Sequence, residues 1–417
     1  MNSKTKQSSP TQGYSKDLAS RIRSVGGDLG ARLGAVVSAV PDQPRGPQRL
    51  ADALGLDKVL TSRLLRAISH AEPAGILHHV PGPDPLRRFL KAARKRDVDL
   101  ASIELAEAAV DRFERLIQDD VGDRSALTAI LSAWSPEARA EFELRRRQSA
   151  YKAISQLKGV SVDLDVSAAF LTPSSDGTSI DVVWLVGLLG LTRLRPGVRI
   201  KVSSRRIMPA PRRRVSTDLD GVVLEGAAIG RLDDHCIAPP ADFTAHRAGD
   251  AIHYTLADEA FGRDSARDMI LAEVNANEMP RYVNPKLLRK GYAYSDVAVP
   301  ARRLVFDVFV HKDIYPNREP ELLVYDTAIG GIADVNDAER DIDRMETTEG
   351  PELLGHGLTR VGLSEASNYS GAVAHVHERM GWQADDLRGY RVRVDYPLYG
   401  AQYALAFEPP APVPGLS

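Results

Sequence analysis

Five side chains between residues 58 and 66 recur at helical spacing and could contact the edges of DNA bases. They are Lys58, Val59, Ser62, Arg63 and Arg66. In a helix these positions lie on one face. Arginine can donate two hydrogen bonds to guanine, serine can bond to a base edge or a phosphate, and a methyl-bearing side chain can contact thymine. The pattern therefore predicts a helix that reads the major groove through these five residues.

A second group of cations follows in the segment LRRFLKAARKR. Arg87, Lys91 and Lys95 are four residues apart, which places them in one stripe along a helix. Such a stripe could contact phosphates beside a recognition helix, and each neutralised phosphate would make DNA binding more salt-dependent. A solvated helix face is the alternative interpretation, and both stay open.

Few residues are arranged in a way that suggests catalysis or metal binding. His375 and His377 lie near Glu378 and could approach His356 in space, but helical spacing makes the two neighbouring histidines diverge. Cys236 follows a polar cluster, yet no second motif supports a nucleophilic cysteine. The glycine-containing loops lack the Lys-Ser/Thr ending of a phosphate-binding loop. We therefore predict no catalytic residue, no metal site and no cofactor.

The residues around the first group indicate two helices joined by a tight turn. Pro47 can occupy the first turn of a bracing helix, where its missing N–H is not needed. Gly55 lies where the chain must reverse and where a left-handed backbone is often required, and Leu56 follows it in the turn. The second helix would face inward through Leu60, Leu64, Leu65 and Ile68.

This segment resembles the winged helix-turn-helix of bacterial transcription regulators of the IclR type. The residues that carry the resemblance are Ala51, Gly55, Leu56, Lys58, Arg63, Leu64 and Leu65. The resemblance covers about residues 29–83 and implies that the second helix is the reader. It also implies that a strand from Gly75 to Val80 begins a wing, and that a downstream domain senses a ligand and mediates dimerisation. A winged helix used only for protein contact, as in the dimerisation domain of O-methyltransferases, is the alternative.

The rest of the chain predicts an α+β protein. We expect a flexible tail over residues 1–20, an all-α winged helix-turn-helix over 21–83, a helical connector over 84–157, a larger mixed α+β domain over 158–410 and a tail over 411–417.

Individual segments make these expectations more specific. Gly26 and Gly27 are expected to break the first helix. After residue 159, seven β-branched segments predict strands, and they begin near residues 160, 197, 251, 303, 321, 390 and 401. Two helices are expected among them, at residues 265–277 and 367–380.

Charge is distributed unevenly along the chain. The net charge is only −2, but residues 1–100 carry 17 lysines and arginines against 9 aspartates and glutamates, a balance of +8. The remainder therefore sums to −10, and a polyanion would dock on the first part. The single cysteine excludes an intramolecular disulfide, and no apolar run is long enough to span a bilayer. We expect a cytoplasmic protein with no membrane partner.

These features together predict a bacterial-type, sequence-specific DNA-binding transcriptional regulator. Its expected partners are double-stranded DNA, a small-molecule effector and a second copy of the chain, because one recognition helix reads few base pairs. The alternative is an enzyme or a defence-system component whose reactive site lies in residues 158–412 and whose winged helix only mediates assembly.

Overall fold

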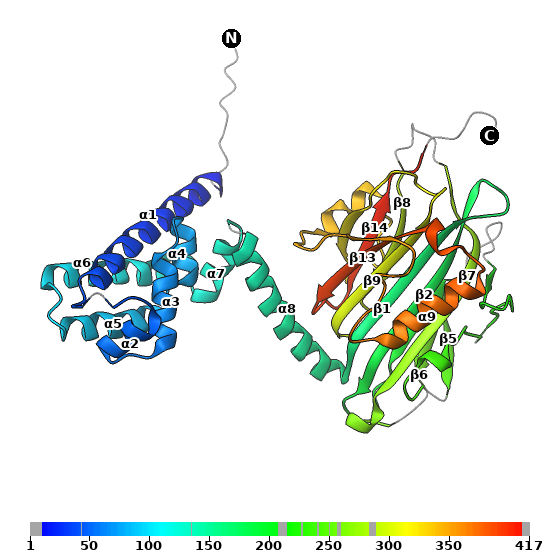
Figure 1. The fold of residues 1–417 in the computed structure, drawn as a ribbon, viewed down its shortest axis with the longest axis horizontal. Coiled ribbons are helices and arrows are strands. Elements are labelled where there is room, and N and C mark those ends of the chain that lie inside the picture. The colour runs from blue at the N-terminus through cyan, green and yellow to red at the C-terminus, as the bar shows by residue number, and fades with distance from the viewer. Residues whose placement is uncertain are drawn as a thin grey trace, which may run out of the picture. The chain divides into compact units, whose positions relative to one another are not determined.

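The computed structural model describes residues 11–42, 44–134, 136–206, 215–226, 228–239, 242–249, 251–256, 260–282 and 289–410. The predicted tail at 411–417 and the first ten residues of the predicted N-terminal tail lie outside these ranges. The described chain is a mixed α+β protein with a helical N-terminal part and a larger, sheet-rich C-terminal part (Figure 1). It forms two compact units, Met1–Arg145 and Arg146–Ser417. Among the described residues, no helix has the length and apolar character needed to cross a membrane.

The N-terminal unit is a set of helices around one apolar core. They are α1 (Thr11–Ser38), α2 (Pro47–Leu54), α3 (Lys58–Ile68), α4 (Pro73–His79), α5 (Pro83–Arg94), α6 (Leu100–Arg115) and α7 (Arg124–Ser132), with a π-helical turn at Leu116–Val121 and the first part of α8 (Pro136–Lys158). Leu33, Leu64, Phe89 and Phe113 are all fully buried in the same core. Residues 84–132, the first part of the connector predicted over residues 84–157, therefore pack with the first helices as one body.

Helix α1 is continuous where a break was predicted. It begins at Thr11, so part of the predicted flexible tail is helical, and it continues through Gly26 and Gly27. A Cβ atom at Gly26 would lie 2.4 Å from the carbonyl oxygen of Pro73. The missing side chain thus lets α1 approach the start of α4 closely, and packing offsets the low helical propensity of glycine.

The strand predicted at Gly75–Val80 is wrong, because this segment is helix α4. Pro73 occupies the first turn, and Ile76 and Leu77 are buried side by side on the inner face. Arg124 donates hydrogen bonds to the carbonyl oxygens of Leu77 and Val80, at 2.7 and 3.0 Å, and so satisfies the end of the helix. All regular elements described in residues 11–145 are helical, so the helix-turn-helix lacks the predicted wing there.

The described residues of the C-terminal unit form three sheets. The seven-stranded sheet has the order β12-β13-β9-β1-β2-β7-β4, and the others are β11-β10-β14-β8 and β3-β6-β5. The main sheet contains β1 (Val160–Pro173), β2 (Ser179–Arg193), β4 (Ser216–Thr217), β7 (Arg267–Pro280), β9 (Ala301–His311), β12 (Glu352–His356) and β13 (Leu387–Asp395). The four-stranded sheet contains β8 (Gly291–Asp296), β10 (Glu321–Asp326), β11 (Arg344–Met345) and β14 (Ala401–Phe407). The three-stranded sheet contains β3 (Lys201–Arg206), β5 (Phe243–Ala248) and β6 (Ala251–Leu256). Strands β1 and β9 pair in parallel, whereas β1 and β2 are antiparallel.

The two faces of the main sheet are covered differently. Helix α9 (Ser367–Arg379) packs on one face, where Tyr369 and Val373 join Phe170 and Phe309 in an apolar core (Figure 1). The four-stranded sheet packs on the other face around residues such as Leu171. The three-stranded sheet forms a further core with β1, β2 and β7. Because β1 is covered on both sides, almost all of its residues are buried, including the polar Asp165 and Ser167.

The helix predicted at residues 265–277 is wrong, because most of the segment belongs to strand β7. Met269 and Leu271 enter one apolar core, while Ile270 and Ala272 enter another. Burial on both faces removes the alternation that marks a half-buried strand, and pairing with β2 overrides the helical propensity of this composition. The helix predicted at 367–380 is confirmed as α9.

A buried ion pair joins two central strands. Arg391 of β13 donates two hydrogen bonds to Asp307 of β9, at 2.8 and 2.7 Å, and the Tyr369 hydroxyl donates a third at 2.7 Å. Asp307 is completely buried and Arg391 is 2% exposed. Burial alone would lower the pKa of Arg391, but its hydrogen bonds to Asp307 and the charge of that carboxylate raise it.

Candidate functional site

The turn between α2 and α3 is defined by local hydrogen bonds and one glycine. Gly55 has φ 66° and ψ 38°, the left-handed conformation expected after a helix. Asp57 caps α3, because its carboxylate accepts a hydrogen bond of 2.7 Å from the amide of Leu60. The hydroxyl of Thr61 donates to the carbonyl of Pro47 at 2.8 Å, which ties α3 to the start of α2. These contacts hold the two helices in a defined arrangement.

One face of α3 is buried and the other is exposed and cationic. Leu60 and Leu64 are buried in the core. All five predicted DNA-binding residues of this helix are exposed: Lys58, Val59, Ser62, Arg63 and Arg66. Val59 is 70% exposed, which is unusual for a valine within a helix. Within the described part of the chain, the side chains of Lys58, Arg63 and Arg66 form no hydrogen bond or ion pair.

The stripe on α5 is only partly available for a partner. The guanidinium of Arg87 forms ion pairs with Asp111 at 2.8 Å and Glu114 at 2.5 Å, both on α6. Hydrogen bonds to these two carboxylates raise the pKa of Arg87 above its usual range. Lys91 and Lys95 are exposed and have no ion-pair partner among the described residues. The structure thus leaves two of the three predicted cations available.

Three histidines lie beside the end of α3, and sequence reasoning did not connect them. The rings of His70 and His79 stack with centroids 4.5 Å apart, and His78 meets His79 edge-on at 4.8 Å. Burial, followed by the charge of Arg66, lowers the pKa of His79 to about 4. His79 is therefore neutral at physiological pH and adds no charge to the exposed face. Adjacency of His78 and His79 was visible in the sequence, but the approach of His70 depends on the fold.

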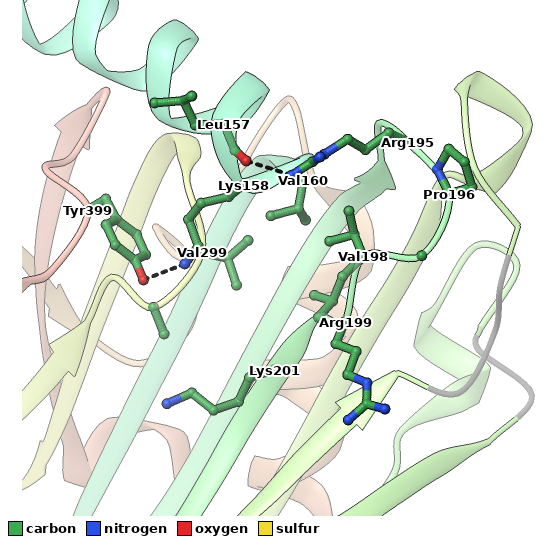
Figure 2. Close-up of a pocket in the computed structure, with 13 residues that line it drawn as sticks. Leu157, Lys158, Val160, Arg195, Pro196, Val198, Arg199, Lys201, Val299 and Tyr399 are labelled. Atoms are coloured by element: carbon green, nitrogen blue, oxygen red, sulfur yellow. Dashed lines mark hydrogen bonds between the residues drawn. The ribbon is translucent and has the colours of Figure 1, made fainter.

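A basic cavity of about 410 Å³ opens in the C-terminal unit (Figure 2). Lys158, Arg195, Arg199 and Lys201 contribute to its lining, which contains no acidic residue. The ammonium group of Lys158 lies 2.8 Å from the Tyr399 hydroxyl and 4.5 Å from the ring centroid. Two other cations, Arg199 and Lys201, are exposed. The cavity has the charge of an anion-binding surface, but it holds no buried polar group without a partner.

A second cavity, of about 300 Å³, is lined by more acidic than basic residues. Its wall includes Asp165 and Ser167 from β1 and Asp296 from β8, with Lys201 from β3 shared with the basic cavity. Burial, followed by the charge of Asp296, raises the pKa of Asp165 well above its usual range. Trp184 and Tyr254 contribute aromatic surface to its lining.

The structure places the histidines and the cysteine considered for chemistry in different surroundings. The Cys236 thiol is half-buried, and burial raises its pKa to about 11. The rings of His235 and His375 lie 5.2 Å apart, and His356 approaches the carbonyl of Asp385 at 3.3 Å. In the part of the chain that the structure describes, no group of three or more His, Cys, Asp or Glu residues is arranged to hold a metal ion. Neither cavity is lined by Cys236, His356 or His375.

Comparison with known proteins identifies no family for this chain. No family model matches it, and no curated protein matches it. A protein described as a putative protease from Parabacteroides distasonis matches 60% of this chain and 40% of its own, with 8% identity and a TM-score of 0.26. A variant of an M1 zinc metallopeptidase from Deinococcus radiodurans, bound to a Tyr-Ser-Ala substrate, matches 59% and 42%, with 8% identity and a TM-score of 0.24. This chain thus spans less than half the length of either structure, and similarity at this level does not establish a shared fold.

Proposed function

We propose that this protein binds duplex DNA through α2 and α3, with α3 in the major groove. The observation that carries the proposal is the exposed face of α3, where three cations have no partner among the described residues while the opposite face is locked into the core. Exposed, uncompensated arginines beside a rigid turn suit the forked recognition of guanine. The proposal concerns a helix-turn-helix without the wing that the sequence predicted.

The roles of individual residues follow from their chemistry. Arg63 and Arg66 contact base edges, Ser62 bonds to a base or a phosphate, and Val59 contacts a thymine methyl group. Lys58 at the start of the helix contacts a phosphate or a base edge. Lys91 and Lys95 position the complex on the phosphate backbone, whereas Arg87 stabilises the contact between α5 and α6.

This mode of DNA binding would serve the regulation of transcription. One recognition helix reads few base pairs, so the proposal includes a dimer of this chain on a palindromic site. The C-terminal unit would then sense an effector or pair the subunits. An assembly role for α3 remains the competing function, because a surface valine that is 70% exposed also suits a protein partner.

Fluorescence anisotropy of the full chain with labelled duplex DNA tests the proposal. Titrations use a pool of random-sequence duplexes at about 50 and 200 mM salt, a range over which phosphate contacts weaken strongly. We expect binding at the lower salt concentration and weaker binding at the higher one. Replacing Arg63 or Arg66 with alanine should then weaken the affinity for a tight-binding sequence selected from this pool by about 5- to 150-fold, corresponding to about 1–3 kcal/mol per base contact.

Arg23→Ala is the matched control, because Arg23 is an exposed cation on α1 of the same unit. Its affinity for DNA should equal that of the unaltered protein. Negligible binding at low salt would refute the proposal and favour protein assembly. Equal losses in the Arg23 and Arg63 variants would show that only overall charge matters, which also contradicts groove reading by α3.

A further inference from the structure

The 300 Å³ cavity lies where two edge strands approach the same face of the main sheet. Strand β8 is the last strand of the four-stranded sheet, and β3 is the last strand of the three-stranded sheet. Both contribute to the lining, together with β1, β2 and β7 of the main sheet. The cavity is thus the gap between two smaller sheets on a common floor. Its size falls at the lower end of the range for small-molecule sites.

Two polar side chains on the floor of this cavity form no hydrogen bond with the residues that the structure describes. Ser167 is 3% exposed, and its hydroxyl forms no hydrogen bond. Asp165 is 7% exposed, and its carboxyl group forms no hydrogen bond with the described residues. Buried polar groups in folded proteins are nearly always paired, because an unpaired one costs about 1–3 kcal/mol. Ser167 is such an exception, and Asp165 presents a carboxyl group without a hydrogen bond from the described residues to the same cavity, which indicates that a ligand supplies partners for both.

The lining carries more acidic than basic side chains, which favours a cationic ligand: Asp165, Glu273, Glu278 and Asp296 stand against Lys201 and Arg205. Asp296 lies close enough to Asp165 for its charge to raise the pKa of the Asp165 carboxyl, although burial is the larger cause. Burial also raises the pKa of Asp296, and the nearby ammonium of Lys201 opposes this change. A ligand with a positive charge and several hydrogen-bond donors would best stabilise two carboxyl groups that are largely shielded from solvent.

The remaining walls distinguish an organic cation from a metal ion. Trp184, Tyr254, Met269 and Leu271 contribute apolar and aromatic surface. Among the described residues, no set of three acidic, histidine or cysteine side chains is arranged to hold a metal. An ammonium group needs only two or three acceptors, and aromatic rings add favourable contacts with a cation and with an apolar body.

We infer that this cavity binds a small primary amine with an apolar or aromatic body. Its ammonium group lies between the carboxylates of Asp165 and Asp296 and donates a hydrogen bond to the Ser167 hydroxyl. Its body packs against Trp184 and the apolar wall formed by β2 and β7. This binding site is independent of the DNA-binding face of α3.

Isothermal titration calorimetry of the full chain without DNA tests the inference. The probes are tyramine and hexylamine, each compared with the neutral alcohol of the same shape, 4-(2-hydroxyethyl)phenol and 1-hexanol. We expect at least one amine to bind saturably with one site per chain, and its neutral analogue to bind at least about tenfold more weakly, which corresponds to about 1.4 kcal/mol. Asp165→Asn and Ser167→Ala should each weaken binding of that amine.

Asp163→Asn is the matched control. Asp163 lies two residues before Asp165 on β1, but its carboxylate is exposed and pairs with Arg302 outside the cavity. This variant should bind the amine as the unaltered protein does. Failure of both amines to bind, equal binding of the neutral analogues, or unchanged affinity in both Asp165→Asn and Ser167→Ala would overturn the inference. Because DNA is absent, none of these outcomes depends on the proposed function.

Discussion

Two arginine–aspartate pairs between β9 and β13 differ in burial and provide a test of the energetics of the main sheet. Arg391 faces Asp307 and Arg303 faces Asp395 in the same antiparallel register. The first pair is 2% and 0% exposed at its side chains, and the second is 36% and 48% exposed, although both have a contact of 2.7 Å. The shortest contact is thus the same in both pairs while solvent access differs, and Arg303 also pairs with Glu365 at 2.6 Å.

Replacing Asp307 with alanine should destabilise the C-terminal unit strongly. The change removes the acceptor of three buried hydrogen bonds and leaves the Arg391 guanidinium buried without its counter-ion. Breaking a buried pair in this way costs about 3–5 kcal/mol. At about 2–4 °C per kcal/mol for a unit of this size, the melting temperature should fall by about 6–20 °C. Differential scanning calorimetry and urea unfolding of the full chain would measure this loss.

The exposed pair provides the control. Asp395→Ala should cost less than about 1 kcal/mol, because the pair is exposed to solvent and Arg303 keeps its contact with Glu365. The double variant Asp307→Leu with Arg391→Met removes both buried charges, so it should recover much of the stability lost in Asp307→Ala. Equal losses at Asp307 and Asp395 would refute the argument that burial determines the cost. A double variant no more stable than Asp307→Ala would refute the role of the orphaned charge.

Three further predictions concern stability. Gly26→Ala should destabilise the N-terminal unit, because its Cβ would lie 2.4 Å from the Pro73 oxygen. A Cβ at Gly34 would meet nothing within 4 Å, so Gly34→Ala should stabilise α1 by about 0.5–1 kcal/mol. Equal shifts in the melting temperatures of the two variants would contradict this. Gly55→Ala should cost about 1–2 kcal/mol through its φ of 66° alone, and urea unfolding would test it against a milder Gly55→Asn. Asp165→Asn should raise the melting temperature more at pH 8 than at pH 4. Folding raises the pKa of Asp165, so its contribution to stability is lost as pH rises above its pKa in the unfolded chain, about 3.9. An effect of the substitution that did not depend on pH would contradict the raised pKa.

Local patterns predicted some elements well because their physical causes are local. The strand at Ala251–Leu256 and the helix at Ser367–Arg379 match the segments expected from residue type and spacing. The turn at Gly55 and the exposed face of α3 also follow from a left-handed glycine and from helical periodicity. These features depend on residues within a few positions of one another, so one segment contains the information needed to predict them.

Other predictions failed where contacts with distant segments of the chain, and not the local pattern, determined the structure or the availability of a residue. The segment predicted as a wing strand is helical because Arg124 satisfies its end and the core buries Ile76 and Leu77. Strand β7 has a helical composition but pairs with β2 and is covered on both faces. Arg87 belonged to a predicted phosphate-binding stripe, yet Glu114 of the next helix engages it.

By itself, the sequence determined the mixed α+β class, the two short helices joined at Gly55 and the exposed residues of the second of them, since each depends on short-range periodicity and turn chemistry. Tertiary structure alone decided which cations stay available and which polar groups share a cavity. Asp165 and Asp296 are 131 positions apart, and only the approach of β8 to the floor formed by β1 brings their charges together. Burial and solvation depend on every neighbouring segment at once, so the pattern around either aspartate carries no sign of the other.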